Sequence, residues 1–293
     1  MSTTNKKVQI IANLVMICAT AFTVIPFLLL FAASLTDSTE IALNGYSFFP
    51  AKLSLEAYAY IWNEKQQIFR AYAITIFTTV VGTTISLLIT TLYAYALSKP
   101  SFIGKKFFSL FLLFTMLFNG GLVPTYTMYT RYLGIKNSIW ALIVPSLLMS
   151  AMNVILVRSY IQNNIPLSLT EAAYIDGANE YRIFAQIVCP LSKPILVTIG
   201  LFIGVGYWND WTNGLYYVTD NKLYSIQQLL NNMLKNIEYL SSNSAAMAST
   251  IIDVPKSTVR MAIAVVGILP ILVIYPYVQK YFVKGIALGA VKG

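Results

Sequence analysis

The sequence predicts an all-α integral membrane protein with six transmembrane helices and with both termini in the cytoplasm. Composition, a series of uncharged segments and the distribution of basic residues carry this prediction. Of the 293 residues, 57% are hydrophobic and only 11% are charged, with a mean hydropathy of +0.66. An ordinary soluble domain carries about 25% charged residues. Lipid is therefore the expected surroundings of most of the chain.

Uncharged length locates the spans, because a helix that crosses the hydrocarbon core needs about 20 residues with few charges. Five segments meet this requirement, and a sixth begins after Lys193 but meets Asp210 after only sixteen uncharged residues. We therefore expect one membrane domain over residues 1–293. Its predicted spans are about 10–33, 70–98, 107–127, 138–158, 194–216 and 260–281.

The first span follows Lys6 and Lys7 and is too long for a typical signal peptide, so we expect an uncleaved anchor. In the second span, small and hydroxyl residues recur every three or four positions, a face typical of close helix packing; hydroxyls that line a polar path are the weaker alternative. The residues of this face are Thr75, Thr79, Gly82, Ser86, Thr90 and Ala94.

Basic residues set the expected orientation. With the N-terminus inside, the inner segments hold eleven lysines and arginines and three acids, whereas nine bases are spread over longer outer loops that hold most of the acids. This excess favours cytoplasmic termini. It also explains the net charge of +9 without a nucleic-acid partner. An external helix is expected near 224–239, from its apolar spacing.

The predicted cytoplasmic loop, residues 165–193, reads as two short helices joined by a turn. Ser168 and Glu171 have capping-box spacing after Pro166, which predicts a helix that begins at Ser168. Asp176 and Gly177 should end that helix, because glycine tolerates positive φ and aspartate bonds to nearby backbone.

This loop resembles the EAA loop of the permeases of bacterial binding-protein-dependent ABC importers. The matching residues are Glu171, Ala172, Ala173, Asp176, Gly177, Ala178, Phe184, Ile187, Pro190 and Leu191. The resemblance continues through Trp208–Trp211 and the C-terminal run 281–293. It is closest to the carbohydrate-uptake branch, the MalG-like permeases of the LplC type.

The resemblance implies an ABC type I importer permease fold in the bacterial cytoplasmic membrane, with carbohydrate, in particular oligosaccharide, as the substrate. It also implies three kinds of partner: a second homologous permease, two ATP-binding subunits and an extracytoplasmic solute-binding lipoprotein. Residues 171–178 would form the coupling helix, which docks in a cleft of the ATPase. The chain has no GxxxxGK[ST] motif, so ATP and Mg are expected in the partner, with no cofactor here.

Candidate sugar contacts are Trp208, Asn209, Asp210 and Trp211, since an ionisable group at membrane depth is a functional candidate and indole rings stack on sugars. Interface anchoring or helix packing is the favoured alternative. Asn153 is a further candidate, although a contact to a neighbouring helix explains it equally well.

Other functions remain open on the sequence alone. An ABC permease for phosphate, amino acids or peptides shares the EAA-type loop, and a secondary or phosphotransferase-type sugar transporter would need no ATPase. A membrane enzyme is disfavoured, because the chain has no histidine and its spans show no clustered acids or metal ligands. Cys18 and Cys189 are expected to be packing residues.

Overall fold

The computed structural model describes residues 6–242 and 256–290, so the last three residues of the C-terminal motif lie outside it. Within these ranges the chain is helical, and its only strand-like pairing is an isolated bridge between Thr36 and Leu53. The fold divides into two compact units, residues 1–67 with 230–272 and residues 68–229 with 273–293. The all-α prediction is confirmed for the described residues.

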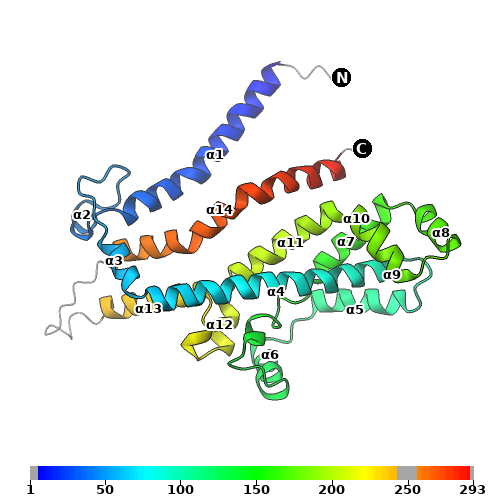
Figure 1. The fold of residues 1–293 in the computed structure, drawn as a ribbon. Helices are drawn as coiled ribbons and strands as arrows, with labels where there is room; N and C mark the ends of the chain where they lie inside the picture. The colour runs from blue at the N-terminus through cyan, green and yellow to red at the C-terminus, as the bar shows by residue number, and fades with distance from the viewer. Residues whose placement is uncertain (1–5, 243–255, 291–293) are drawn as a thin grey trace. The chain divides into compact units, whose positions relative to one another are not determined.

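The first unit contains α1 (Lys6–Ser34), α2 (Ser38–Asn44) and α3 (Glu56–Asn63) (Figure 1). Polar bonds order the segment after α1. Asp37 caps α2 and pairs with Lys52 at 2.8 Å, and the Glu40 carboxylate accepts the backbone N–H groups of Ala51 and Lys52. A predicted external loop therefore has a defined local fold.

The second unit is built on α4 (Lys65–Ser98), α5 (Lys105–Leu117), α7 (Ala151–Asn164) and α11 (Lys193–Trp208). These helices run alongside one another in Figure 1, and their buried apolar side chains form one core. The core takes Leu97 from α4, Leu112 from α5 and Ile199 from α11, for example. It also takes Ile183 and Val188 from the predicted cytoplasmic loop.

Three predicted spans, the third, the fourth and the fifth, are interrupted. The third ends its first helix at Leu117, and after a break it continues as α6 (Leu122–Thr127) and η1 (Met128–Tyr132), bent by 116°. Gly121 takes φ +84°, and the Asn119 side chain accepts its N–H. The fourth holds only η2 (Ile139–Leu142) and a non-helical stretch, 143–150, before α7 begins. Pro145 explains this second break, because proline cannot donate a helical hydrogen bond.

Side chains from other helices bond to three of the carbonyl groups in the stretch 143–150. The Tyr207 hydroxyl donates to the Ile143 carbonyl at 2.8 Å, and the Asn213 amide donates to the Pro145 carbonyl at 2.9 Å. The Ser86 hydroxyl of α4 donates to Leu147 at 3.4 Å. A non-helical backbone at membrane depth needs such partners, because lipid offers none.

After α11 come α12 (Thr212–Tyr217), η4 (Asn221–Leu223), α13 (Ile226–Ser242) and α14 (Lys256–Ala290). The helix predicted near 224–239 is thus present as α13, with Ile226 and Leu229 buried. The sixth predicted span lies inside α14. The fifth ends its first helix at Trp208, before its predicted end at 216.

Among the described residues, two helices are long and apolar enough to cross a membrane, Val8–Ser34 and α4. Two bent pairs raise the number to four when each is counted as one span: Lys105–Leu117 with Leu122–Tyr132, and Glu180–Leu191 with Lys193–Trp208. Ser257–Val273 is a shorter apolar helix. The count of six spans and the orientation of the termini remain predictions.

The small-residue face of α4 is a packing face. Gly82 lies against the Tyr207 ring, and a methyl group added there would stand 2.5 Å from the ring carbon Cζ. Ser86, Thr90 and Ala94 are buried, while the Thr75 hydroxyl accepts the Ile226 N–H of α13 at 2.8 Å. Close helix approach, the favoured interpretation of this face, therefore describes it well.

We expect Gly82→Ala to lower the stability of the purified protein, because the new methyl group forces Tyr207 away and strains its bond to Ile143. Overpacking of this kind costs about 1–3 kcal/mol. The matched control is Gly200→Ala on α11, where the nearest atom, Leu87 Cδ2, is at an ordinary 3.5 Å. Thermal unfolding in detergent is the measurement, and equal midpoints for the two variants would contradict the packing argument.

Candidate functional site

The predicted cytoplasmic loop begins with α8 (Leu167–Ile175). Pro166 is the N-cap, with extended backbone, and no side chain caps the helix there. The capping box expected from Ser168 and Glu171 is therefore wrong. Proline fixes φ and starts the helix one residue earlier, so that Ser168 lies inside the first turn. The Thr170 hydroxyl instead donates to the Leu167 carbonyl at 2.8 Å.

The turn after α8 matches the prediction. Asp176 is the C-cap and Gly177 takes φ +79°. The N–H of Gly177 bonds to the Tyr174 carbonyl, and that of Ala178 bonds to the Ala173 carbonyl at 2.9 Å. This pair of bonds is the Schellman arrangement, which requires the left-handed conformation that glycine favours.

A second helical stretch follows the turn: α9 (Glu180–Ile183), η3 (Phe184–Val188) and α10 (Cys189–Leu191). The Asn179 side chain caps α9 by accepting the Arg182 N–H at 2.9 Å. The stretch bends by 80° into α11 at Ser192. Two short helical segments joined by a turn are thus present, as the sequence predicted.

The tip of this loop is exposed and partly apolar. Glu171, Ala172, Asp176 and Gly177 are exposed, whereas Ala173 and Ala178 pack against the core of the second unit. Two large side chains beside the turn are almost uncovered, Ile175 at 87% and Tyr181 at 84% exposed. The tip thus presents apolar, small and acidic side chains together, which makes it a candidate contact surface for another protein.

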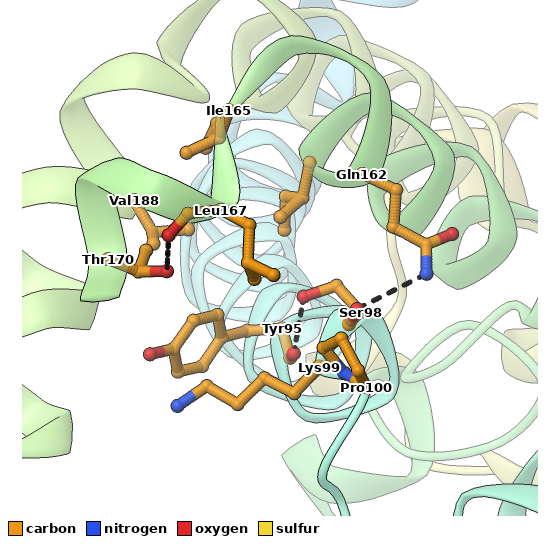
Figure 2. A pocket seen from close by; sticks show the side chains of 10 residues that line it. Tyr95, Ser98, Lys99, Pro100, Gln162, Ile165, Leu167, Thr170 and Val188 are labelled. Atoms are coloured by element: carbon orange, nitrogen blue, oxygen red, sulfur yellow. Dashed lines mark hydrogen bonds between the residues drawn. The ribbon is translucent and has the colours of Figure 1, made fainter.

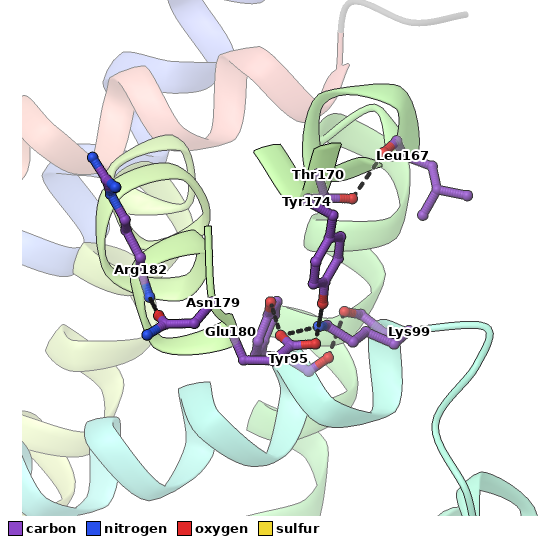
Figure 3. Close-up of polar contacts among 9 residues, drawn as sticks. Tyr95, Lys99, Leu167, Thr170, Tyr174, Asn179, Glu180 and Arg182 are labelled. Carbon is purple, nitrogen blue, oxygen red and sulfur yellow. Dashed lines mark hydrogen bonds and ion pairs between the residues drawn. The ribbon is translucent and has the colours of Figure 1, made fainter. Parts of the chain in front are cut away.

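A polar cluster joins the base of the loop to the end of α4 (Figure 3). Lys99 forms an ion pair with Glu180 and donates to the Tyr174 hydroxyl at 2.7 Å. The Tyr174 hydroxyl donates to the Glu180 carboxylate, and the Tyr95 hydroxyl donates to it at 2.8 Å. The Lys99 ammonium also lies 4.6 Å from the centre of the Tyr95 ring, a cation–π distance.

Electrostatics stabilise the charged forms in this cluster. Partial burial by itself raises the pKa of the Glu180 carboxyl, but hydrogen bonds from Lys99, Tyr174 and Tyr95 outweigh it and hold that pKa below its ordinary value. Burial likewise disfavours the Lys99 ammonium, yet its bond to Glu180 and its tyrosine contacts raise the pKa of Lys99 well above its usual range. Both groups are charged at neutral pH.

A cavity of about 270 Å³ lies beside the cluster (Figure 2). Tyr95 and Ser98 line it from α4, Lys99 from the residue after α4, Gln162 from α7 and Thr170 from α8. The Gln162 amide crosses from α7 and donates to the Ser98 carbonyl at 3.2 Å. The sequence analysis missed these polar residues, since their pairing joins segments more than sixty positions apart. The only sequence signal was a lysine directly after an apolar span.

The candidate sugar contacts divide into two groups. Trp208 is buried, whereas Asn209 and Trp211 are exposed. The Asp210 carboxylate accepts the N–H groups of Thr212 and Asn213 at 3.1 and 3.2 Å, so it caps the start of α12. Asn153 is half-buried on α7, apart from this group in the sequence.

A second cavity of about 240 Å³ adjoins this region, where the break before α6 and the start of α12 meet. Asn119, Ser146, Asn213 and Tyr216 contribute to its lining. Trp208, Asn209, Asp210 and Trp211 are not among its lining residues. No group of three or more metal-binding side chains occurs among residues 6–242 and 256–290.

These features define the class: a helical membrane protein with interrupted apolar helices. Between α7 and α11 it has an exposed loop of two short helical segments joined by a turn. The chain belongs to the family of binding-protein-dependent transport system inner membrane components, whose family model matches residues 71–288. The match includes the loop and α11, so it confirms the resemblance found in the sequence.

Relatives cover nearly the whole chain. The chain is 38% identical over 270 residues to the polygalacturonan/rhamnogalacturonan transport system permease protein YtcP of Bacillus subtilis. The alignment covers 92% of this chain and 93% of YtcP. It is 36% identical over 273 residues to Protein LplC of the same organism, 93% and 90% of the two chains. A solved bacterial ABC transporter involved in import of the acidic polysaccharide alginate matches with a TM-score of 0.80 and 29% identity, over 96% of this chain and 99% of that one.

We expect Asp210→Ala to lower stability by about 1 kcal/mol, the usual contribution of a lost N-terminal cap. Asp210→Asn should keep most of that stability, because the amide oxygen still accepts both N–H groups. Thermal unfolding of the two variants in detergent tests the capping role. A loss for Asn as large as that for Ala would show that the charge itself is required.

Proposed function

We propose that the chain is the permease subunit of an ATP-binding-cassette importer that carries a carbohydrate, in particular an oligosaccharide, across the bacterial cytoplasmic membrane. Family membership gives the transport role. The names of the relatives, which concern polygalacturonan, rhamnogalacturonan and alginate, support a carbohydrate. Oligosaccharides released from polygalacturonan are accordingly the first substrates to test.

The exposed loop tip is the observation that carries the mechanism. A rigid turn at Gly177 presents Glu171, Ala172 and Asp176 beside the uncovered Ile175 side chain. We propose that this tip is the coupling helix and docks in a cleft of the ATP-binding subunit. Closure of two such subunits would then move α7 and α11, the helices to which the loop is joined.

The partners follow from this role. We propose a second homologous permease, two ATP-binding subunits and an extracytoplasmic solute-binding lipoprotein, with ATP and Mg bound by the ATPase and no cofactor in this chain. Six spans with cytoplasmic termini place the loop on the ATPase side of the membrane. Each interrupted span then counts as one crossing.

We propose sugar contacts for only part of the stretch Trp208–Trp211. Asn209 and Trp211 are exposed and have groups that suit a sugar, an amide for hydroxyls and an indole face. Trp208 and Asp210 serve packing and capping. We therefore expect any direct sugar contact in this stretch to come from Asn209 and Trp211.

A permease for another solute and a transporter that works without an ATPase are the competing functions. Affinity purification of the chain from its native membrane separates them. Recovery of an ATP-binding subunit supports an ABC importer, and uptake of polygalacturonan oligosaccharides, but not of phosphate or amino acids, supports a carbohydrate.

The orientation is tested by labelling. In a chain with Cys18→Ala and Cys189→Ala, we expect Lys222→Cys to react with a membrane-impermeant maleimide in intact cells, because η4 is predicted to lie outside. Ala185→Cys, on η3, should react only after the membrane is permeabilised. Labelling of Ala185→Cys in intact cells would put the loop outside and contradict the proposal.

The docking role is tested with Glu171→Ala and Gly177→Val. The first removes an exposed carboxylate, and the second forces a β-branched residue into the left-handed region, at a cost of about 1–2 kcal/mol. We expect at least a several-fold loss of co-purified ATPase and of transport, with membrane insertion unchanged. Lys222→Ala, an exposed change on the predicted opposite side, is the control. Normal ATPase attachment in both loop variants would refute docking at this tip.

A further inference from the structure

Two of the helices beside the loop are joined to it by the chain, and one is not. α7 leads into α8 through Ile165 and Pro166, and α10 leads into α11 through Ser192. A pull on the loop therefore reaches α7 and α11 directly. α4 ends at Ser98, far from the loop in sequence, so that only non-covalent contacts can transmit a pull to it.

The polar contacts between α4 and the loop gather in the cluster of Lys99, Glu180, Tyr174 and Tyr95 (Figure 3). Lys99 follows the last residue of α4, Tyr174 lies in α8, and Glu180 is the first residue of α9. The ammonium thus holds both helices of the loop at once. It does so from a partly enclosed position, since its side chain is 19% exposed.

Apolar packing supports the same junction. The rings of Tyr95 and Phe184 lie 5.2 Å apart, and Leu97 of α4 shares the buried core with Ile183 and Val188 of the loop. An isolated exposed ion pair contributes about 0–1 kcal/mol. Here two tyrosine hydroxyls also bond to the pair, although Glu180 and Tyr174 are about half exposed, and the polar bonds and the packed core together join α4 to the loop.

We propose that Lys99 and Glu180 are positioning residues that make the inner end of α4 move with the coupling loop, so that the ATPase drives three helices of this subunit. The inference rests on the proposed function and adds a residue pair and a driven helix to it. The ATPase displaces the loop tip where it docks, and the Lys99–Glu180 clamp transmits part of that displacement to α4.

α4 is suited to carry such a movement across the membrane. It is an unbroken helix of 34 residues without proline, about 50 Å long at 1.5 Å per residue. Gly82 is held against the Tyr207 ring, and near the far end Thr75 accepts the Ile226 N–H at the start of α13. A displacement at Lys99 is thereby carried to the predicted outer segment.

The test uses the complete transporter, with its ATPase and binding protein, in proteoliposomes. The variants are Lys99→Met, Glu180→Gln and the exchange Lys99→Glu with Glu180→Lys, and Lys106→Met on an exposed lysine nearby is the matched control. We expect the single variants to transport at least threefold less polygalacturonan oligosaccharide per ATP hydrolysed while the ATPase still co-purifies. The exchange should restore part of that ratio.

A second measurement needs no sugar. Spin labels at Ala185→Cys in the loop and Leu88→Cys on α4, in the background without Cys18 and Cys189, report the distance between loop and helix. With the clamp intact, the distance should stay the same with and without Mg-ATP and vanadate. In Lys99→Met, the distribution of label distances should broaden or shift after vanadate trapping. If Lys99→Met does not assemble, Tyr174→Phe is measured instead.

The outcomes separate the two proposals. A parent complex that lacks an ATPase, or shows no ATP-dependent uptake, contradicts the proposed function. A working parent whose Lys99 and Glu180 variants keep a normal transport ratio and an unchanged label distance overturns the clamp alone. A lowered ratio in Lys106→Met equal to that in Lys99→Met would also overturn it, because charge loss anywhere at this end would then suffice.

Discussion

The fold depends on one requirement: every backbone N–H and C=O at membrane depth needs a partner within the protein. Unbroken helices such as α4 meet it by themselves. The stretch 143–150 does not, and the side chains of Ser86, Tyr207 and Asn213 supply partners for three of its carbonyl groups. These bonds fasten α4, α11 and α12 to the same break. The non-helical segment thereby becomes the point where three elements are joined.

The packing of the loop bears on its proposed coupling role. The main core of the second unit includes Ile183 and Val188 of the loop, while Leu142 and Tyr217 belong to a second, smaller cluster. The loop is thus packed into the bundle at its base and exposed only at its tip. A rigid base with an exposed tip suits a surface that receives a push or pull from another protein and passes it on. Close-packed interiors transmit displacement well, because they leave little room to absorb it.

The same logic separates the roles of charged residues in the second unit. Asp210 was a candidate sugar contact because charge at membrane depth is costly, with anchoring or helix packing as the favoured alternative. Its carboxylate accepts two N–H groups where α11 ends and α12 starts, which gives it a structural role. Lys99 looked like a simple inner-side lysine and proves to be the centre of a polar network. In both cases the meaning of the charge comes from its hydrogen-bond partners.

The sequence by itself determined the features that depend on local chemistry. Low charge and long apolar segments indicated a helical membrane protein, and Gly177 indicated the turn, because only a residue without Cβ takes φ +79° at little cost. The spacing around Glu171 indicated the family, which the match over residues 71–288 confirms. Tertiary structure alone decided which distant side chains bond to the broken fourth span, which helix face meets Tyr207, and that Lys99 pairs with Glu180. Those outcomes depend on contacts between segments tens of residues apart, and neither hydropathy nor local spacing encodes which distant partner a side chain will find.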